Sequence, residues 1–188
     1  AMMFGAPDVW DALMRKIERT NSWYDAVTKV IDTANLASTA VSNRAWMNDP
    51  FIARMIQVRR LAWQVRDRYG IHCSVLRSNV NSSKPLDDTQ KRSLAQWDGT
   101  IASGWAGMAE LLAAPDVTAE LVTAAKEAQA KTDGVLKQIG DLTKNFDGSG
   151  KPAMTAADWN ALCQSPFPLI VGVATKALDQ SIARAETV

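Results

Sequence analysis

Residues 51–80, FIARMIQVRRLAWQVRDRYGIHCSVLRSNV, decide the fold that we expect for this chain. We predict that they form one long helix, with Asp49 as its N-cap and Pro50 at the first helical position, where the missing N–H of proline costs nothing. Side chains suited to a core recur in alternating steps of three and four, which is the spacing of a helix face that packs on other helices. They are Met55, Val58, Ala62, Val65, Tyr69, His72 and Leu76. The stretch therefore predicts a helical bundle.

Positive charge is concentrated in the same stretch, which contains six arginines and one acid, Asp67. The whole chain has a net charge of only +1, whereas a general nucleic-acid binder normally has a pI above ~9. At about 100° per residue, Arg60 points away from the apolar face, and Arg66 and Arg54 lie closest to it. A partly buried guanidinium needs a partner, so Arg66 is our main candidate for binding an anion. The alternative is an ion pair between Arg66 and an acid on another helix.

Two neighbouring helices are predicted around this one. Upstream, apolar positions recur at helical spacing from Pro7 to about Trp46. Downstream, residues 79–85 (NVNSSKP) are predicted to form a loop. Asp87 and Gln90 form a capping-box pair that begins a third helix, which ends before Pro115. The expected core positions of that helix are Leu94, Trp97, Ile101, Trp105, Met108 and Leu111 or Leu112.

The last third of the chain predicts three more helices. The fourth helix has an alanine-rich middle and the core positions Val117, Leu121, Ala124, Ala128, Lys131 or Thr132, Val135, Ile139, Leu142 and Phe146. After a loop at residues 147–152, Thr155 and Asp158 form a second capping box, which begins a short helix. Pro166 and Pro168 are expected to interrupt or kink the final helix, because each removes a backbone donor and clashes with the preceding turn. From Leu169 the core spacing is expected to resume through Val173, Leu178, Ile182 and Ala185.

These elements predict an all-α fold, because period-two strand patterns are absent from the sequence. We expect one domain over residues 1–188, an elongated up-and-down bundle of four long helices, a short helix and a proline-kinked C-terminal helix. The N- and C-termini of such a bundle lie at the same end of it. No apolar run approaches the ~18 residues that cross a bilayer. Ala1 before Met2 is expected to be a remnant of expression, and the chain a piece of a longer protein.

Familiar catalytic and metal motifs fail on spacing. GSGK at residues 148–151 lacks the P-loop glycine at Asn145 and the Ser or Thr at Pro152. An EF-hand loop starting at Asp147 would place Pro152 at its obligatory glycine. The chain has one histidine, His72, which we interpret as a core residue rather than a catalytic base. We therefore predict no enzyme, no cofactor and no metal site.

The two cysteines, Cys73 and Cys163, have no metal-ligand spacing and allow one disulfide at most. They are either small buried side chains or a pair that closes a loop of about 90 residues. The sequence leaves both alternatives open.

A pocket is expected against the alanine-rich middle of the fourth helix, since small side chains leave space opposite large ones. Trp97 and Trp105 lie eight residues apart on one helix face, and they either fill the core or form the wall of an apolar pocket. A second apolar strip, Leu61, Ile71 and Val75, lies on the far side of the arginine-rich helix. Such a helix is either central in a bundle or half of a dimer interface.

The chain resembles a known family at LAWQVRDRYG (61–70), at the loop to Pro85, at residues 90–112 with Trp105, and at residues 159–185. It is similar to the all-helical extracytoplasmic sensor domains of bacterial methyl-accepting chemotaxis proteins, of the nitrate/nitrite-sensing or four-helix-bundle kind. The resemblance covers residues 51–188. It implies ligand sensing in the periplasm, a homodimer, and two flanking membrane helices that signal to a cytoplasmic domain.

In related sensors, arginines on bundle helices hold small anions, and the resemblance implies that the matching position here is Arg59 or Arg66. We therefore predict that a small, anionic ligand binds between the arginine-rich helix and its neighbours and is transmitted by helix displacement. The predicted ligand-binding residues are Arg66, Arg59, Tyr69, Trp97 and Trp105. The alternative is a helical scaffold that binds a protein partner and has no small ligand. Neither prediction includes nucleic acid.

Overall fold

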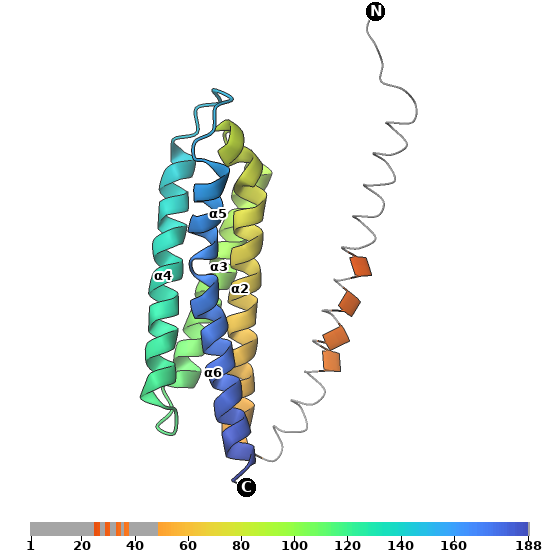
Figure 1. Ribbon diagram of the computed structural model, residues 1–188, viewed down its shortest axis with the longest axis vertical. Coiled ribbons are helices and arrows are strands. Elements are labelled where there is room, and N and C mark those ends of the chain that lie inside the picture. The colour runs from red at the N-terminus through yellow and green to blue at the C-terminus, as the bar shows by residue number, and fades with distance from the viewer. Residues whose placement is uncertain (1–24, 27–28, 31–32, 35, 38–48, 188) are drawn as a thin grey trace, which may run out of the picture. The chain divides into compact units, whose positions relative to one another are not determined.

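The computed structural model describes residues 25–26, 29–30, 33–34, 36–37 and 49–187 (Figure 1). The chain divides into two units, Ala1–Asn48 and Asp49–Val188. The described residues of the first unit are helical, and the rest of the helix predicted over 7–46 lies outside the described residues. A single domain over 1–188 stays a prediction.

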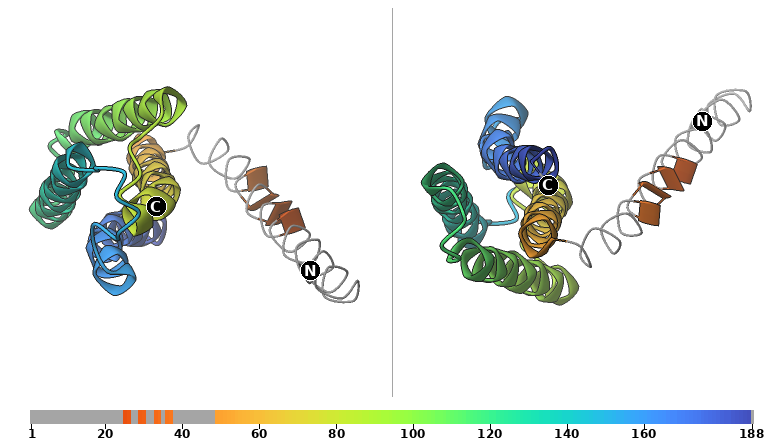
Figure 2. Two further views of the ribbon diagram at one scale, coloured as in Figure 1. Left: turned by 90° about the horizontal axis from the view of Figure 1, so that it is seen from above. Right: turned by 90° about the horizontal axis from the view of Figure 1, so that it is seen from below.

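The second unit is all-helical, as predicted. Its elements are α2 (Pro50–Ser82), α3 (Asp88–Leu112), α4 (Ala119–Lys144), α5 (Ala156–Gln164) and α6 (Phe167–Ala185). They run up and down, with α5 and α6 together forming the fourth column (Figure 1). In the views along the bundle, α3 and α6 each neighbour α2, and α4 lies across from it (Figure 2). Among the described residues there is no strand.

Helix α2 begins as the sequence predicts. The Asp49 carboxylate accepts hydrogen bonds from the N–H groups of Phe51 (2.8 Å) and Ile52 (3.3 Å), and Pro50 is the first helical residue. All seven predicted core side chains of this helix are buried. One of them, His72, places Nε2 3.2 Å from the Asp98 carboxylate of α3, which confirms its interpretation as a core residue.

The predicted loop at 79–85 is wrong in its first half, because α2 continues to Ser82. Asn79 is only 1% exposed. Its side-chain amide donates to the Lys84 carbonyl (2.9 Å), and its side-chain oxygen accepts from the Gln90 amide (2.9 Å). These tertiary bonds outweigh the local preference of asparagine for loops. The helix ends at Ser82, and its C-cap Ser83 has a left-handed φ of 46°.

The predicted N-caps of the next helices are confirmed. Asp87 and Gln90 form the complete capping box of α3. For α5 only the N-cap half of the predicted box is confirmed. Thr155 accepts from the Asp158 N–H (3.1 Å), and the Asp158 carboxylate accepts from the Thr155 hydroxyl (2.7 Å) rather than from the Thr155 backbone. Of the alternatives left open, Leu112 and Thr132 are the buried residues. Of the two adjacent alanines of α4, the buried one is Ala125 rather than the predicted Ala124, which is half-buried.

The two prolines separate α5 from α6, as predicted. Pro166 immediately precedes α6 and Pro168 lies in its first turn. The last helix begins at Phe167. The core positions predicted for it are wrong except Val173, because α6 packs on its neighbours through another face. Its buried residues are Ile170, Val173, Ala174, Ala177 and Ser181, whereas Leu169, Leu178, Ile182 and Ala185 are exposed. Cys73 of α2 and Cys163 of α5 form a disulfide, with their Cα atoms 6.1 Å apart. The bond fixes the short α5 to the longest helix of the unit.

One helical stretch among the described residues, Ala156–Ala185, is long and apolar enough to cross a membrane by length and composition alone. The sequence prediction that no stretch approaches this limit was therefore too strict. The stretch contains both prolines and divides into α5 and α6, which pack on α2 and α4. A single stretch of this kind is weak evidence, because the core helix of a soluble protein passes the same test of length and composition.

An ion pair joins the start of α2 to the end of α6. The Arg184 Nε donates to the Asp49 carboxylate at 2.8 Å. The start of α2 and the end of α6 therefore lie at the same end of the bundle, as the up-and-down topology predicts.

The same ion pair predicts a pH dependence. The hydrogen bond from Arg184, helped by the N–H groups of Ile52 and Phe51, holds the pKa of Asp49 below its ordinary value of 3.8 despite the opposing effect of burial. A lowered folded-state pKa contributes stability that is present above pH 3.8 and is lost as pH falls through the folded value. We expect the unfolding free energies of wild type and Asp49→Asn to differ by a constant amount above about pH 5 and to converge below pH 3.8.

Urea unfolding from pH 7 to 2 measures this difference. Arg184→Gln is the matched control, because it removes the same pair from the other side and should weaken the pH dependence similarly. A difference between wild type and Asp49→Asn that stays constant down to pH 2 contradicts the assignment.

Candidate functional site

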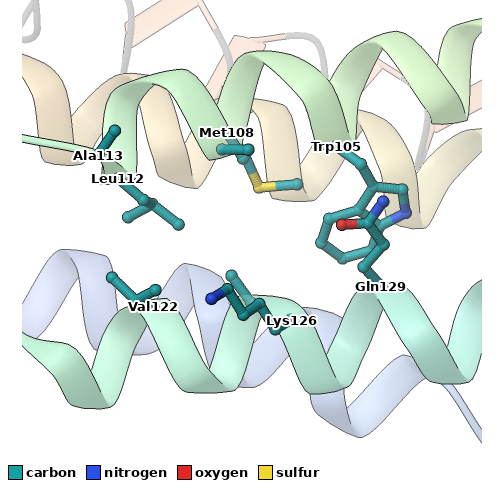
Figure 3. A pocket seen from close by; sticks show the side chains of 9 residues that line it. Trp105, Met108, Leu112, Ala113, Val122, Lys126 and Gln129 are labelled. Carbon is teal, nitrogen blue, oxygen red and sulfur yellow. The ribbon is translucent and has the colours of Figure 1, made fainter.

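An apolar groove lies between α3 and α4 (Figure 3). Its volume is about 220 Å³, and nine residues line it: Trp105, Met108, Ala109, Leu112, Ala113, Val122, Ala125, Lys126 and Gln129. Helix α4 packs more extensively on α6 than on α3, so the groove follows the looser of its two contacts. The location matches the pocket expected against the alanine-rich middle of the fourth helix.

Small side chains form much of the groove wall. Ala109 is contributed by α3, Ala113 is the C-cap of that helix, and Ala125 is contributed by α4. These residues are spaced so that each lies on the helix flank facing the other helix, next to the buried Met108 and Leu112. The alanines therefore leave unfilled space that larger side chains would occupy.

Three of the lining residues have polar side-chain groups. Trp105 is 2% exposed, and its indole Nε1 has no hydrogen-bond partner in the described part of the chain and is buried, so this N–H does not open onto the groove. The Gln129 side chain reaches toward Trp105 at one end of the groove, and Lys126 lies next along α4 (Figure 3). Among the nine lining residues there is no acid.

The predicted site residues on α2 lie elsewhere. The Arg66 guanidinium carbon lies 4.9 Å from the centroid of the Trp63 ring and 5.3 Å from that of Phe167. Both distances are typical of cation–π contacts. Arg66 therefore joins α2 to α6 through aromatic rings, and within residues 49–187 it does not form the ion pair considered as the alternative.

Tyr69 belongs to the same contact between α2 and α6. It is fully buried, and its ring meets Phe167 edge to face with centroids 5.3 Å apart. Its hydroxyl has no hydrogen-bond partner within residues 49–187, and burial raises the pKa of Tyr69. Tyr69 and Arg66 are thus brought together, but neither lines the groove.

The remaining predicted residues are separated from each other. Trp105 is the only one of the five that lines the groove. Trp97 is half-buried on α3 and packs against the core. Arg59 is half-buried on α2 and makes its own interaction. The structure therefore does not gather the five residues into one site, and their role in ligand binding stays a prediction.

Sequence reasoning missed Lys126 and Gln129. Val122, Ala125, Lys126 and Gln129 follow steps of three, one and three, so they share one face of α4. That spacing was a usable signal, but the two polar residues flank the buried positions and read as solvent-exposed. Among described residues, no group of three or more His, Cys, Asp or Glu could hold a metal ion.

An exposed apolar face is the second notable surface of the bundle. Val171, Leu178 and Ile182 of α6 are 38%, 42% and 49% exposed, and they lie within about 40° of one another around the helix. On α2, Ile52, Ile56 and Trp63 share a face in the same way. We call these six residues the α2–α6 face.

The two halves of the α2–α6 face are adjacent. The contacts Asp49–Arg184 and Tyr69–Phe167 fix the antiparallel register of α2 and α6. This register places Ile52 level with Ile182, and Trp63 level with Val171. The predicted far-side strip of α2 lies elsewhere, since its Leu61 packs toward Gly107 of α3.

No family model, curated protein or solved structure matches this chain. By its fold, the described bundle belongs to the class of four-helix bundles. It contains one disulfide and an apolar groove between two of its helices.

Proposed function

We propose that this chain is an extracytoplasmic ligand-sensing domain of a bacterial transmembrane receptor, of the kind found in chemotaxis receptors. The apolar groove between α3 and α4 is the observation that carries the proposal. The Cys73–Cys163 disulfide suits an oxidising compartment such as the periplasm. The adjacent ends of α2 and α6 suit attachment to two membrane helices.

A ligand in the groove would act on the spacing of α3 and α4. Helix α4 packs extensively on α6, and Glu120 of α4 pairs with Lys176 of α6. The end of α6 is in turn paired with the start of α2. A ligand that favours one spacing of α3 and α4 therefore biases the α6 end of the bundle, with a coupling of about 1–3 kcal/mol. Transmission is by helix displacement.

Filling the groove tests this proposal. A panel of small organic and inorganic compounds is scored by the rise in melting temperature of the wild type. We expect Ala125→Leu, which fills the groove, to lose the rise produced by each active compound. Ala130→Leu is the matched control, because Ala130 is exposed on the same helix and outside the groove.

The Arg66→Ala variant distinguishes binding in the groove from binding at the site predicted on α2. We expect it to retain ligand-induced stabilisation, since Arg66 does not line the groove. If Arg66→Ala loses the ligand-induced rise in melting temperature and Ala125→Leu retains it, the ligand binds at the site predicted on α2, and the groove assignment is wrong. Circular dichroism confirms that each variant is folded.

We further propose that the receptor is a homodimer and that the α2–α6 face is covered by the same face of a second copy. Rim charges support self-association. Arg60 on the α2 side and Asp179 on the α6 side are both exposed, and within residues 49–187 neither forms an ion pair. Two copies related by an axis along the bundle would bring Arg60 of one close to Asp179 of the other.

Charging the α2–α6 face should separate the dimer. We expect Leu178→Asp to weaken dimerisation more than tenfold in analytical ultracentrifugation, because it buries an unpaired charge. Leu169→Asp is the matched control, since Leu169 has similar exposure (38%) but lies on another flank of α6. Arg60→Glu should also weaken the dimer, and adding Asp179→Arg should restore it.

The alternative function, a helical scaffold for another protein, is favoured by the same exposed face. A wild-type chain that stays monomeric at high concentration and responds to no compound in the panel would favour the scaffold over the sensor.

A further inference from the structure

We propose that the groove between α3 and α4 binds a compact, uncharged and apolar molecule of about the size of one six-membered ring. This inference rests on the proposed function and specifies the ligand class of its site. It differs from the small anion that the sequence predicts, because the arginines behind that prediction, Arg59 and Arg66, lie on α2 and do not line the groove.

The size of the ligand follows from the groove volume of about 220 Å³. An engineered protein cavity of about 150 Å³ with an apolar lining binds benzene, so this groove has room for one ring with small substituents. A helix with its side chains is about 10–12 Å in diameter, and a space of this volume cannot enclose it. The groove is therefore suited to a small molecule rather than to a helix of another protein.

The apolar character of the ligand follows from the side chains that line the groove. Alanines lie along both of its walls, and Leu112 and Val122 are at one end (Figure 3). Trp105 lines the other end with ring carbons, because its N–H is buried and does not open onto the groove. A hydroxyl or charged group held against these side chains would lose its water without gaining a hydrogen bond, which costs free energy.

The other two polar side chains of the lining keep their contact with water. Lys126 is exposed, and its side chain runs along α4 toward Val122 (Figure 3). Its methylene groups therefore add apolar surface while the ammonium group stays hydrated, and an exposed charge of this kind contributes little to binding an anion. Gln129 is half-buried at the Trp105 end. No lining residue is an acid, so a ligand cation would have no partner in the groove.

Calorimetric titration of the full chain with matched one-ring probes tests the ligand class. p-Xylene is the apolar probe, and hydroquinone has two hydroxyls in place of its two methyl groups. The groove is open to water where Ala109 and Ala113 are exposed, so one polar group can stay hydrated there, but two on opposite sides of a ring cannot. We expect p-xylene to bind at least tenfold more tightly than hydroquinone. The acid 4-methylbenzoate and the cation 4-methylbenzylamine should each bind several-fold more weakly than p-xylene.

Substitutions of the polar lining residues distinguish an apolar site from a polar one. Gln129→Met replaces the amide by an apolar side chain of similar length and should raise the affinity for p-xylene, whereas a ligand held by the amide would lose affinity. Lys126→Met keeps the apolar stem and removes the charge, so we expect an affinity for p-xylene within about twofold of the wild type. Lys126→Ser removes most of the stem and should weaken p-xylene binding several-fold.

Filling variants assign the binding of p-xylene to the groove. Ala109 and Ala106 are both exposed on α3, and only Ala109 lines the groove. We expect Ala109→Leu to weaken p-xylene binding more than tenfold and Ala106→Leu to leave it unchanged. Ala125→Leu fills the groove from α4 and should abolish binding. Because Ala109 is exposed, a leucine there leaves the core packing intact, so this variant stays informative if Ala125→Leu fails to fold.

The proposed class is overturned if p-xylene does not bind, or if hydroquinone or 4-methylbenzoate binds as tightly as p-xylene. It is also overturned if Gln129→Met weakens p-xylene binding, or if Ala109→Leu leaves it unchanged. If another compound stabilises the wild type and loses its effect in Ala125→Leu, the ligand class is wrong and the proposed sensor function stands. The sensor function itself fails only if no compound in the wider panel acts through the groove.

Discussion

Replacing Cys73 and Cys163 together by alanine is expected to lower the free energy of unfolding by about 4 kcal/mol. The two residues are 90 positions apart, and in the chain-entropy model a cross-link stabilises by restricting the unfolded chain, more so for a longer loop. The effect is large here because α5 has nine residues and few other contacts with α2. Urea unfolding of wild type and double variant gives the difference.

Reduction of the wild type provides the control for this prediction. Under dithiothreitol the wild type should approach the stability of the Cys73→Ala/Cys163→Ala variant, whereas the variant should not respond. Both cysteines are buried, so alanine also removes some packing, and the comparison with the reduced wild type separates that contribution. A difference below about 1 kcal/mol would contradict a major role for the cross-link.

Helix boundaries could be predicted where a side chain signals them locally. Asp49, Asp87 and Thr155 each accept a backbone hydrogen bond within three residues, so their chemistry is visible in the sequence. The end of α2 is different. Asn79 is helical because its amide bonds to Lys84 and Gln90, and a contact eleven residues away is not visible in local preference. Tertiary context decides such positions.

The candidate site, too, could be predicted from the sequence only in part. The alanines of α4 and the indole of Trp105 could be predicted as pocket residues, because small and large side chains at core spacing leave space. The role of Arg66 could not be predicted. Its guanidinium is suited to an anion, but the ring of Phe167, 101 residues away in sequence, lies 5.3 Å from it. Residue type indicates what a side chain can bind, and packing decides what it contacts.

Gly104→Ala is expected to lower the free energy of unfolding by about 2 kcal/mol. Gly104 is buried on α3 where it faces α2, and a Cβ added there would lie 2.6 Å from Cγ2 of Val65. Val65 is fully buried and its branched side chain has one strongly preferred rotamer in a helix. It cannot turn aside, so α2 and α3 must separate. Thermal and urea unfolding measure the loss.

Gly99→Ala is the matched control on the same helix. A Cβ at Gly99 would meet no atom within 4 Å, so alanine should raise stability by up to about 1 kcal/mol through its higher helix propensity. The two substitutions are chemically identical, and only the neighbouring atoms differ. Opposite signs would therefore show that the approach of α2 to α3, rather than glycine's backbone freedom, explains the cost at Gly104.

A double-mutant cycle identifies the atom responsible. In a Val65→Ala background the clashing Cγ2 is absent, so Gly104→Ala should no longer destabilise and should instead add the small gain from helix propensity. If the loss persists in that background, the obstacle is the α2 backbone, whose nearest atom is the Leu61 carbonyl oxygen at 3.8 Å. A reversal of sign would instead show that Val65 and Gly104 set the spacing of α2 and α3 as a pair, because neither residue alone determines how closely the two helices approach.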